Sequence, residues 1–320
     1  MNIQISECTN QMTYPDLYPV GAVRMPREPP GADRASWPRL AIMTSAELTP
    51  DQLRRDPLPL RGRVAVVTGV SRPAGIGYAI ARRLAALGAS LFLHQFAQHD
   101  NDQPRGADPG GPQAVLTGVT AARADDQSGV RHVDLDLTEP GAPERLIDAV
   151  GQAFGHLDIL VSNHARSGGD GPLGTLTAAM LDGHWAVNTR SAILLAQAFA
   201  AQHDGRPGGR VVFMTSGQDL GPMTGEVAYA ASKGALASIT RTLADQLAGQ
   251  AITLNTVNPG PVDTGGYPPE VLKAVRRHFP QQRWGVPDDP ARLIAWLVTD
   301  EAAWITGQVI NTEGGFRRWG

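Results

Sequence analysis

Residues 63–88 read RVAVVTGVSRPAGIGYAIARRLAALG, and the rest of the chain is best interpreted outward from them. "RVAVVTG" is a short continuous apolar run, which is typical of a strand covered on both faces of a parallel sheet. "GYAIARRLAALG" has helical spacing and ends in glycine, so a helix is expected directly after that strand. Gly69, Gly75 and Gly77 lie between the two. The stretch therefore predicts a strand, a glycine-rich turn and a helix.

Strand and helix patterns alternate through the rest of the chain. Apolar runs predict six more strands, at 90–96, 130–137, 157–163, 210–216, 252–258 and 307–315. Helical spacing predicts helices at 143–154, about 181–202 and about 229–248. This order predicts an α/β fold, a Rossmann-type doubly wound parallel sheet of about seven strands with helices on both faces, in a single domain. Residues 98–114, rich in Asp, Gly and Pro, are expected to form a surface loop.

The first 60 residues differ in composition from the rest of the chain. They contain nine of the 25 prolines and show no sustained period, so 1–60 is expected to be an irregular Pro-rich extension, with room for a short helix at 44–55. The catalytic domain is expected at 61–320. The net charge of −3 gives no electrostatic footprint for nucleic acid or an anionic membrane. A single cysteine, Cys8, and the lack of a signal or membrane-spanning segment predict a cytoplasmic protein.

The glycines between the first strand and the first helix predict a nucleotide site. A dinucleotide pyrophosphate needs close backbone approach and free N–H groups at a helix N-terminus. The strand–turn–helix context is the one that this motif requires. Dinucleotide choice depends on the end of the second strand, where neither Gln95 nor Phe96 is acidic, while Arg72 and Arg105 could supply positive charge. NADP(H) is therefore favoured over NAD(H).

Tyr229 and Lys233 are the candidate reaction centre. Residues four apart share a helix face, and a nearby cation lowers the pKa of a phenol from its ordinary value of about 10. Such a tyrosine can exchange a proton with a carbonyl oxygen. Ser216 ends a predicted strand thirteen residues earlier, where ligands of parallel sheets bind, and Asn188 lies among apolar residues upstream. No cluster of metal ligands is expected.

These motifs resemble the short-chain dehydrogenase/reductase family over residues 61–316, most closely its 3-oxoacyl-[acyl-carrier-protein] reductase-like members. The family turn is usually T-G-x-x-x-G-x-G, whereas this chain has five residues between Gly69 and Gly75. The resemblance implies Tyr229 as acid/base and Lys233 as its partner and ribose contact. It also implies that Ser216 binds the substrate oxygen and that Asn188 holds a water relay.

The resemblance also implies cofactor contacts. Asp136 would face the adenine amine with Leu137 beside the ring. "VSNHA" stands where the family has N-N-A-G, so Asn163 matches, while Ser162 and His164 depart. A lone histidine is more often structural than catalytic. The remaining cofactor contacts implied are Ser71, Ile76, Pro259, Gly260 and Thr264.

The sequence thus predicts an NAD(P)(H)-dependent oxidoreductase that interconverts a ketone and a secondary alcohol. Residues 262–287 have the Gly and Pro content of a substrate lid. The basic stretch 273–279 is the candidate contact for a carrier-bound substrate, against an ordinary solvated helix face. The resemblance implies a homotetramer or homodimer. Two alternatives stay open: a non-catalytic dinucleotide sensor or scaffold, and a lyase, epimerase or dehydratase on the same fold.

Overall fold

The computed structural model describes residues 49–51, 53–102, 106–108 and 110–319. Most of the expected N-terminal extension, including Cys8, lies outside the described residues, as does Arg105. Within the expected short helix at 44–55, the described residues between 50 and 54 form turns and a bend. The chain divides into two units, Met1–Arg54 and Arg55–Gly320.

The second unit begins at Arg55 rather than at residue 61. Leu60 is the reason, because its side chain is fully buried in the core. Its N–H also donates to the carbonyl of Leu87 at the end of the first helix, 3.0 Å away. The residues just before the first strand therefore belong to the folded unit.

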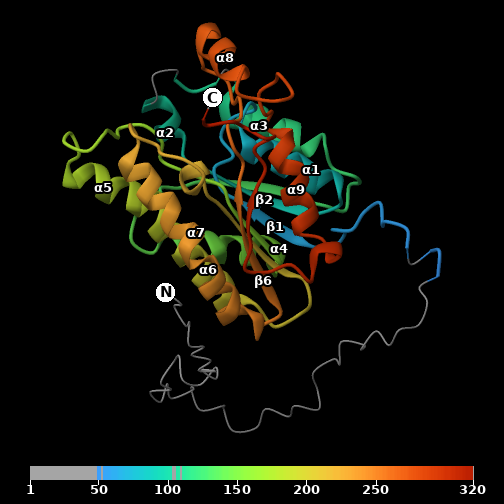
Figure 1. Cartoon of the computed structure of the whole chain (residues 1–320). Coiled ribbons are helices and arrows are strands. Elements are labelled where there is room, and N and C mark those ends of the chain that lie inside the picture. The colour runs from blue at the N-terminus through green and yellow to red at the C-terminus, as the bar shows by residue number, and fades with distance from the viewer. Residues whose placement is uncertain (1–48, 52, 103–105, 109, 320) are drawn as a thin grey trace, which may run out of the picture. The chain divides into compact units, whose positions relative to one another are not determined.

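Seven parallel strands form one sheet in the order β3-β2-β1-β4-β5-β6-β7. Figure 1 labels β2, β1 and β6 of this sheet. The sheet confirms the predicted doubly wound α/β fold. Every strand falls within a predicted apolar run, apart from Gly209 at the start of β5. The bounds are β1 Val64–Val67, β2 Ser90–Gln95, β3 Val130–Asp134, β4 Ile159–Ser162, β5 Gly209–Met214, β6 Ile252–Asn258 and β7 Val309–Asn311.

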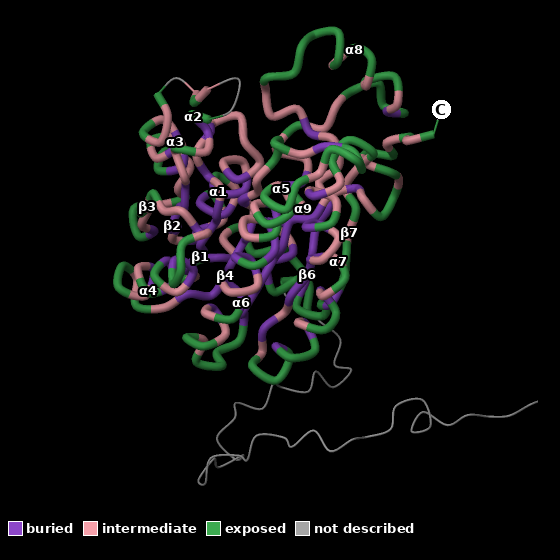
Figure 2. Tube along the Cα trace, turned by 90° about the vertical axis from the view of Figure 1, so that its left-hand side faces the viewer, coloured by how far each residue is buried: buried purple, intermediate pink, exposed green. Residues whose placement is uncertain are grey.

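Helices cover both faces of the sheet because side chains alternate along a strand. Ala65 and Val67 of β1 pack in the core that lies under α1 (Ile76–Ala86), α3 (Gly111–Thr120) and α9 (Asp288–Leu297). Val64 and Val66 pack in a second core, under α4 (Ala142–Phe154), α6 (Ser191–Gln202) and α7 (Val227–Ala248). Figure 2 shows the resulting buried centre, with exposed residues on the outer helix surfaces.

The expected loop at 98–114 is partly helical, which corrects the prediction. Residues Ala97–Asp102 form α2, and α3 begins at Gly111. In α2 the Gln98 side chain donates to the Asp102 carboxylate one turn later, at 2.7 Å. In α3 Pro112 occupies the first turn, where its missing N–H costs nothing. Composition alone missed these local helix signals.

The expected helix at about 181–202 has three parts. They are α5 (Ala178–His184), a π-helical segment at Trp185–Arg190 and α6. Two short 3₁₀ segments lie at Gly217–Asp219 and Asp300–Ala302, and α8 spans Pro269–Arg276. Among the described helices, none has the length and apolar content needed to cross a bilayer.

Candidate active site

The turn between β1 and α1 can be built only with glycine at two positions. Gly69 has φ +70°, and a Cβ there would lie 2.7 Å from Cα of His164. A Cβ on Gly77 would lie 2.6 Å from the carbonyl oxygen of Gly69. Gly75 caps α1 without a side-chain hydrogen bond, and no acidic residue occupies the first turn. The turn therefore presents a helix N-terminus that can hold an anion.

Arg72, in the extended part of this turn, is buried and already paired. Its guanidinium donates to the Asp108 carboxylate at 3.0 Å and to the carbonyl of Thr264 at 3.2 Å. The side chain is only 9% exposed. The positive charge of Arg72, which the sequence analysis used to favour NADP(H), is thus paired with the Asp108 carboxylate. Through Thr264, Arg72 also links the glycine turn to the expected lid.

A buried hydrogen-bond network supports the turn from below. The hydroxyl of Thr68 accepts the N–H groups of Asn163 and His164, at 3.0 and 3.2 Å. The amide of Asn163 donates to the carbonyls of Thr68 and Gly69. Asn163 therefore holds the shape of the turn. Its predicted role as a cofactor contact stays a prediction.

His164 continues the network toward α6. Its Nδ1 lies 2.7 Å from the Thr68 hydroxyl, and its Nε2 lies 2.7 Å from the Ser191 hydroxyl and 3.0 Å from the Val187 carbonyl. Because Ser191 donates to Val187, Nε2 carries the proton and Nδ1 accepts from Thr68. Burial lowers the pKa of His164 well below its ordinary value. A neutral histidine with partners on both nitrogens fits the expected structural role.

His94, at the end of β2, supports the same turn, and sequence reasoning missed it. Its Nε2 donates to the carbonyl of Leu135, so its Nδ1 is free to accept the N–H of Gly69 at 3.3 Å. Burial lowers the pKa of His94 to about 4, which keeps the ring neutral. The sequence signal was a histidine directly after the apolar residues Leu91, Phe92 and Leu93.

The other expected cofactor residues lie at the carboxyl edge of the sheet. Asp136 follows β3, and its Oδ1 accepts the N–H and hydroxyl of Thr138, both at 2.8 Å. Leu137 is 5% exposed and packs in the core with α4 and α6, which leaves little of its surface for a ring. Ser71 lies in the glycine turn and Ile76 is the first residue of α1.

The turn after β6 is also shaped for close approach. Gly260 has φ +67°, and its N–H donates to the side chain of Asn258 at 2.9 Å. Pro259 stands between them, and Thr264 follows at the start of the expected lid. Because parallel strands end on the same edge, this turn and the glycine turn lie along one side of the sheet.

Tyr229, Ser216 and Lys233 come together beside this edge. Tyr229 lies in the first turn of α7, close enough to Ser216, which follows β5, for the Ser216 hydroxyl to act against the rise in the pKa of the phenol. Lys233 is 2% exposed, and its Nζ donates to the carbonyl of Met214 at 2.8 Å. That nitrogen lies 6.0 Å from the centre of the Tyr229 ring. The structure therefore brings the three predicted residues together.

Asn188 lies within the π-helical segment and is 1% exposed. Its Nδ2 donates to the hydroxyl of Ser232 at 2.9 Å, beside Lys233. Its side chain also exchanges two hydrogen bonds with the backbone of Arg166, at 2.7 and 3.1 Å. Single π turns inside α-helices often occur at functional sites. Asn188 thus ties α7 to the segment after β4.

The pKa shifts differ from the sequence-based expectation. Burial raises the pKa of Tyr229 to about 12, and the hydrogen bond with Ser216 offsets this only in part. Burial lowers the pKa of Lys233 to about 7. The expected lowering of the phenol pKa by Lys233 is therefore absent from this structure. The physical reason is that both groups are desolvated and the ammonium is directed at Met214.

Asp170, which sequence reasoning missed, fixes the N-terminus of α7. Its carboxylate accepts the N–H groups of Ala228 and Tyr229, at 3.0 and 2.7 Å, and that of Gly171 at 2.7 Å. Burial acts to raise the pKa of Asp170, but these backbone hydrogen bonds outweigh it, so the pKa is lowered. Asp170 is 58 and 59 residues from its α7 partners, so no local pattern could have revealed it.

Two further features lie outside this group of residues. The expected lid contains α8 and a bridge between Val262 and Gly285.

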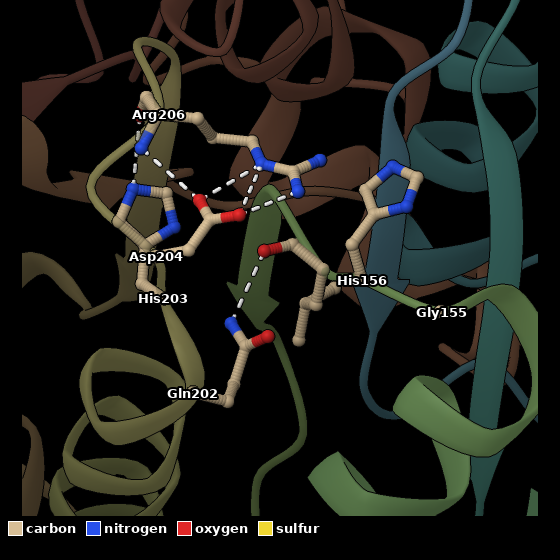
Figure 3. A pocket seen from close by; sticks show the side chains of 7 residues that line it. Gly155, His156, Gln202, His203, Asp204 and Arg206 are labelled. Carbon is tan, nitrogen blue, oxygen red and sulfur yellow. Dashed lines mark hydrogen bonds and ion pairs between the residues drawn. The ribbon is translucent and has the colours of Figure 1, made fainter.

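A polar pocket, shown in Figure 3, is lined by Gly155–Leu157 and by Gln202–Asp204 and Arg206. These segments precede β4 and β5, so this pocket is at the amino ends of the strands, opposite Tyr229. No group of three metal-ligating side chains occurs among residues that the structure describes.

Comparison with known proteins places this geometry in a family. The family described as Enoyl-(Acyl carrier protein) reductase matches residues 69–317. The protein named "Uncharacterized oxidoreductase YjdA" of Bacillus subtilis is 40% identical over 258 residues, covering 80% of this chain and 97% of that one. The "NADPH-dependent aldehyde reductase-like protein, chloroplastic" of Arabidopsis thaliana is 33% identical, covering 84% and 99%.

A solved structure supports the same family assignment as these two relatives. A short chain dehydrogenase from Burkholderia cenocepacia in complex with NADP superposes with a TM-score of 0.69 and 35% identity, covering 80% of this chain and 98% of that one. The chain therefore belongs to the short-chain dehydrogenase/reductase family of oxidoreductases.

Proposed function

We propose that the protein is an NADP(H)-preferring reductase that interconverts a ketone and a secondary alcohol, with Tyr229 as the acid/base. The observation that carries this is the contact of Tyr229 with Ser216, beside buried Lys233, at the edge where the glycine turn opens. Two hydroxyl groups on one side of that edge can both bond a carbonyl oxygen as it gains negative charge. The cofactor supplies the hydride.

The chain's own residues divide the remaining work in this proposal. Ser216 orients the substrate oxygen, and Tyr229 transfers the proton. Lys233 stays within reach of the phenol and of a ribose, while Asn188 holds the adjoining turn of α7 in place. The four positions match the family's catalytic pattern, and Asp170 fixes the first turn of the helix that carries Tyr229.

The residues around the glycine turn fit a dinucleotide. Gly69 and Gly77 allow the tight turn, because a Cβ on either would clash with His164 or with the Gly69 carbonyl, and α1 offers its N-terminus to a pyrophosphate. NADP(H) is preferred in this proposal because β2 ends without an acidic residue at Gln95 and Phe96. A relative named as NADPH-dependent and a neighbour bound to NADP support the same choice.

The substrate would lie between Tyr229 and the lid at 262–287. Lys273, Arg276 and Arg277 on and after α8 form the proposed contact for a carrier-bound substrate, although Phe279 in the same stretch is buried. We further infer a cytoplasmic homotetramer or homodimer, as the family resemblance implies.

The test is a substrate panel with NADPH and NADH, followed by absorbance of the reduced cofactor. The panel contains small ketones, 3-oxoacyl thioesters and an enoyl thioester, because the matching family description is that of an enoyl reductase. Tyr229→Phe should lower the rate by about 10²–10⁴-fold while leaving cofactor binding intact. Wild-type turnover in Tyr229→Phe would refute the proposal, and so would reduction of the enoyl substrate alone.

Cofactor preference has a separate measurement. Binding of NADPH and NADH is followed by fluorescence, and NADPH should bind more tightly. Tighter binding of NADH would refute the preference and leave the reaction class untouched.

A further inference from the structure

Residues Glu313–Arg318, here called the C-terminal segment, are tied to the rest of the fold by largely buried side chains. The side chains of Glu313 and Arg318 are 7% and 17% exposed, and they form a two-bond ion pair. Figures 1 and 2 both place the C-terminus beside α8, at the lid end of the molecule.

The segment first contacts the turn after β6. The Glu313 carboxylate accepts a hydrogen bond from the Asn258 amide at 2.8 Å. The same Asn258 side chain accepts the N–H of Gly260 at 2.9 Å. A Cβ on Gly260 would lie only 2.7 Å from Cα of Glu313, so the two backbones are in direct contact. Glu313 therefore fixes the turn at Gly260, one of the expected cofactor contacts.

Its second contact is the loop that follows Ser216. A Cβ on Gly217 would meet the Arg318 guanidinium and would lie 2.8 Å from the Glu313 carboxylate. A Cβ on Gly221 would meet the aliphatic stem of Arg318. Gly217 is buried beneath this ion pair, immediately after Ser216. Arg318 thus lies across the whole loop at 217–221.

The third contact is the lid. The N–H of Arg317 donates to the carbonyl of His278, and Nδ1 of His278 donates to the carbonyl of Arg317, both at 2.9 Å. The ring of Phe316 lies 5.0 Å from that of Phe279, whose side chain is 3% exposed. Phe279 in turn contacts Trp284, near the end of the lid.

We propose that Glu313 and Arg318 are positioning residues, which hold the Ser216 loop, the Gly260 turn and the lid in a fixed mutual arrangement through one shielded ion pair. The catalytic consequence rests on the proposed function, whereas the structural coupling does not. Charge-assisted two-bond pairs are strong and directional. Loss of Arg318 leaves the Glu313 carboxylate buried without its cation, so the segment should detach from all three sites.

Hydrogen exchange and enzyme kinetics on the full-length chain test this. Arg318→Ala should raise amide exchange about tenfold or more at 216–221 and at 278–284. Arg317→Ala, which removes the same charge from the exposed neighbouring side chain, should exchange like wild type. With an accepted ketone, Arg318→Ala should lower kcat by about 10–100-fold, the scale of a small misplacement of reacting groups. Arg318→Lys should recover part of this loss, since it keeps the charge without the two-bond geometry.

Gly217→Ala provides a second perturbation that keeps every native charge. Its backbone is outside the left-handed region, so alanine meets only the crowding from Arg318 and Glu313. It should raise exchange at 278–284, although that segment is distant in sequence. If Arg318→Ala does not fold, hydrogen exchange in Gly217→Ala tests the coupling in its place.

The outcomes separate the two proposals. If wild type reduces no carbonyl but Arg318→Ala and Gly217→Ala loosen both segments, the proposed function fails and the coupling stands. If neither variant changes exchange in either segment, the coupling is overturned. Equal loosening in Arg317→Ala also overturns it, because the ion pair would then not be the cause.

Discussion

Replacing Lys233 by methionine should make the stability of the protein less dependent on pH between pH 7 and pH 9. Burial lowers the pKa of Lys233 from 10.5 to about 7, and the residue is 2% exposed with its Nζ on the Met214 carbonyl. Between these two pKa values, the unfolded chain holds the proton and the folded chain does not. The free energy of unfolding must therefore rise with pH across this window.

The size of the effect follows from the two pKa values. One pKa unit corresponds to about 1.4 kcal/mol. From pH 7 to pH 9, titration of Lys233 should add roughly 2 kcal/mol to the free energy of unfolding of wild type. Below pH 7 the full penalty for burying the charge applies, and above pH 10.5 it disappears.

Urea unfolding, followed by tryptophan fluorescence at pH 7 and pH 9 without cofactor and at one protein concentration, measures this difference. The rise from pH 7 to pH 9 should be about 2 kcal/mol larger in wild type than in Lys233→Met. Lys273→Met is the matched control, because Lys273 lies on α8, where no residue is buried. The same pH dependence in wild type and Lys233→Met would refute the reasoning, since the buried amine would then keep its proton.

Three further predictions concern contacts that the sequence did not reveal. Asp170→Ala should lower the free energy of unfolding by about 1–2 kcal/mol in urea, because the N–H groups at the start of α7 lose their acceptor; an unchanged midpoint would count against a capping role. Arg72→Gln should weaken NADPH binding about tenfold more than NADH binding. Asp108→Asn, which removes the carboxylate that pairs with the Arg72 guanidinium, should strengthen NADPH binding. Equal effects on the binding of both cofactors would exclude Arg72 as a phosphate contact. His164→Ala should lower the thermal midpoint and weaken cofactor binding together, because Thr68 loses its buried partner; a variant with native cofactor affinity would show that the network does not support the turn.

Much of the fold could be predicted from the sequence because its signals are local. A buried parallel strand is a short apolar run, and a helix has apolar residues three and four apart, so all seven strands and the helices α1, α4, α6 and α7 were located, whereas α9 was not. The prediction of a loop at 98–114 was wrong because it relied on residue composition and not on the spacing of apolar residues. Residues 98–114 contain many helix-breaking residues, yet Gly111 and Pro112 begin a helix rather than a loop.

The candidate site was predictable to the extent that its residues lie after strand ends or share a helix turn. Tyr229 and Lys233 are four apart on α7, and Ser216 comes after β5, so their proximity is a consequence of the fold class alone. Their protonation could not be deduced in this way. The pKa of a phenol or an amine depends on how much water surrounds it, and burial at this site exceeds the influence of either group on the other.

The sequence by itself determined the order of strands and helices, the glycine turn and the four-residue spacing of the tyrosine and the lysine, because each depends on neighbours along the chain. Only the tertiary structure decided what supports them. Each support is a contact between residues far apart in the chain. Asp170 caps α7, Arg72 pairs with Asp108, His164 bonds both Thr68 and Ser191, and the C-terminal segment contacts the Gly260 turn, the Ser216 loop and the lid. Such contacts exist only once the sheet has brought its carboxyl edge together, since side chains far apart in sequence have no local pattern that marks them as partners.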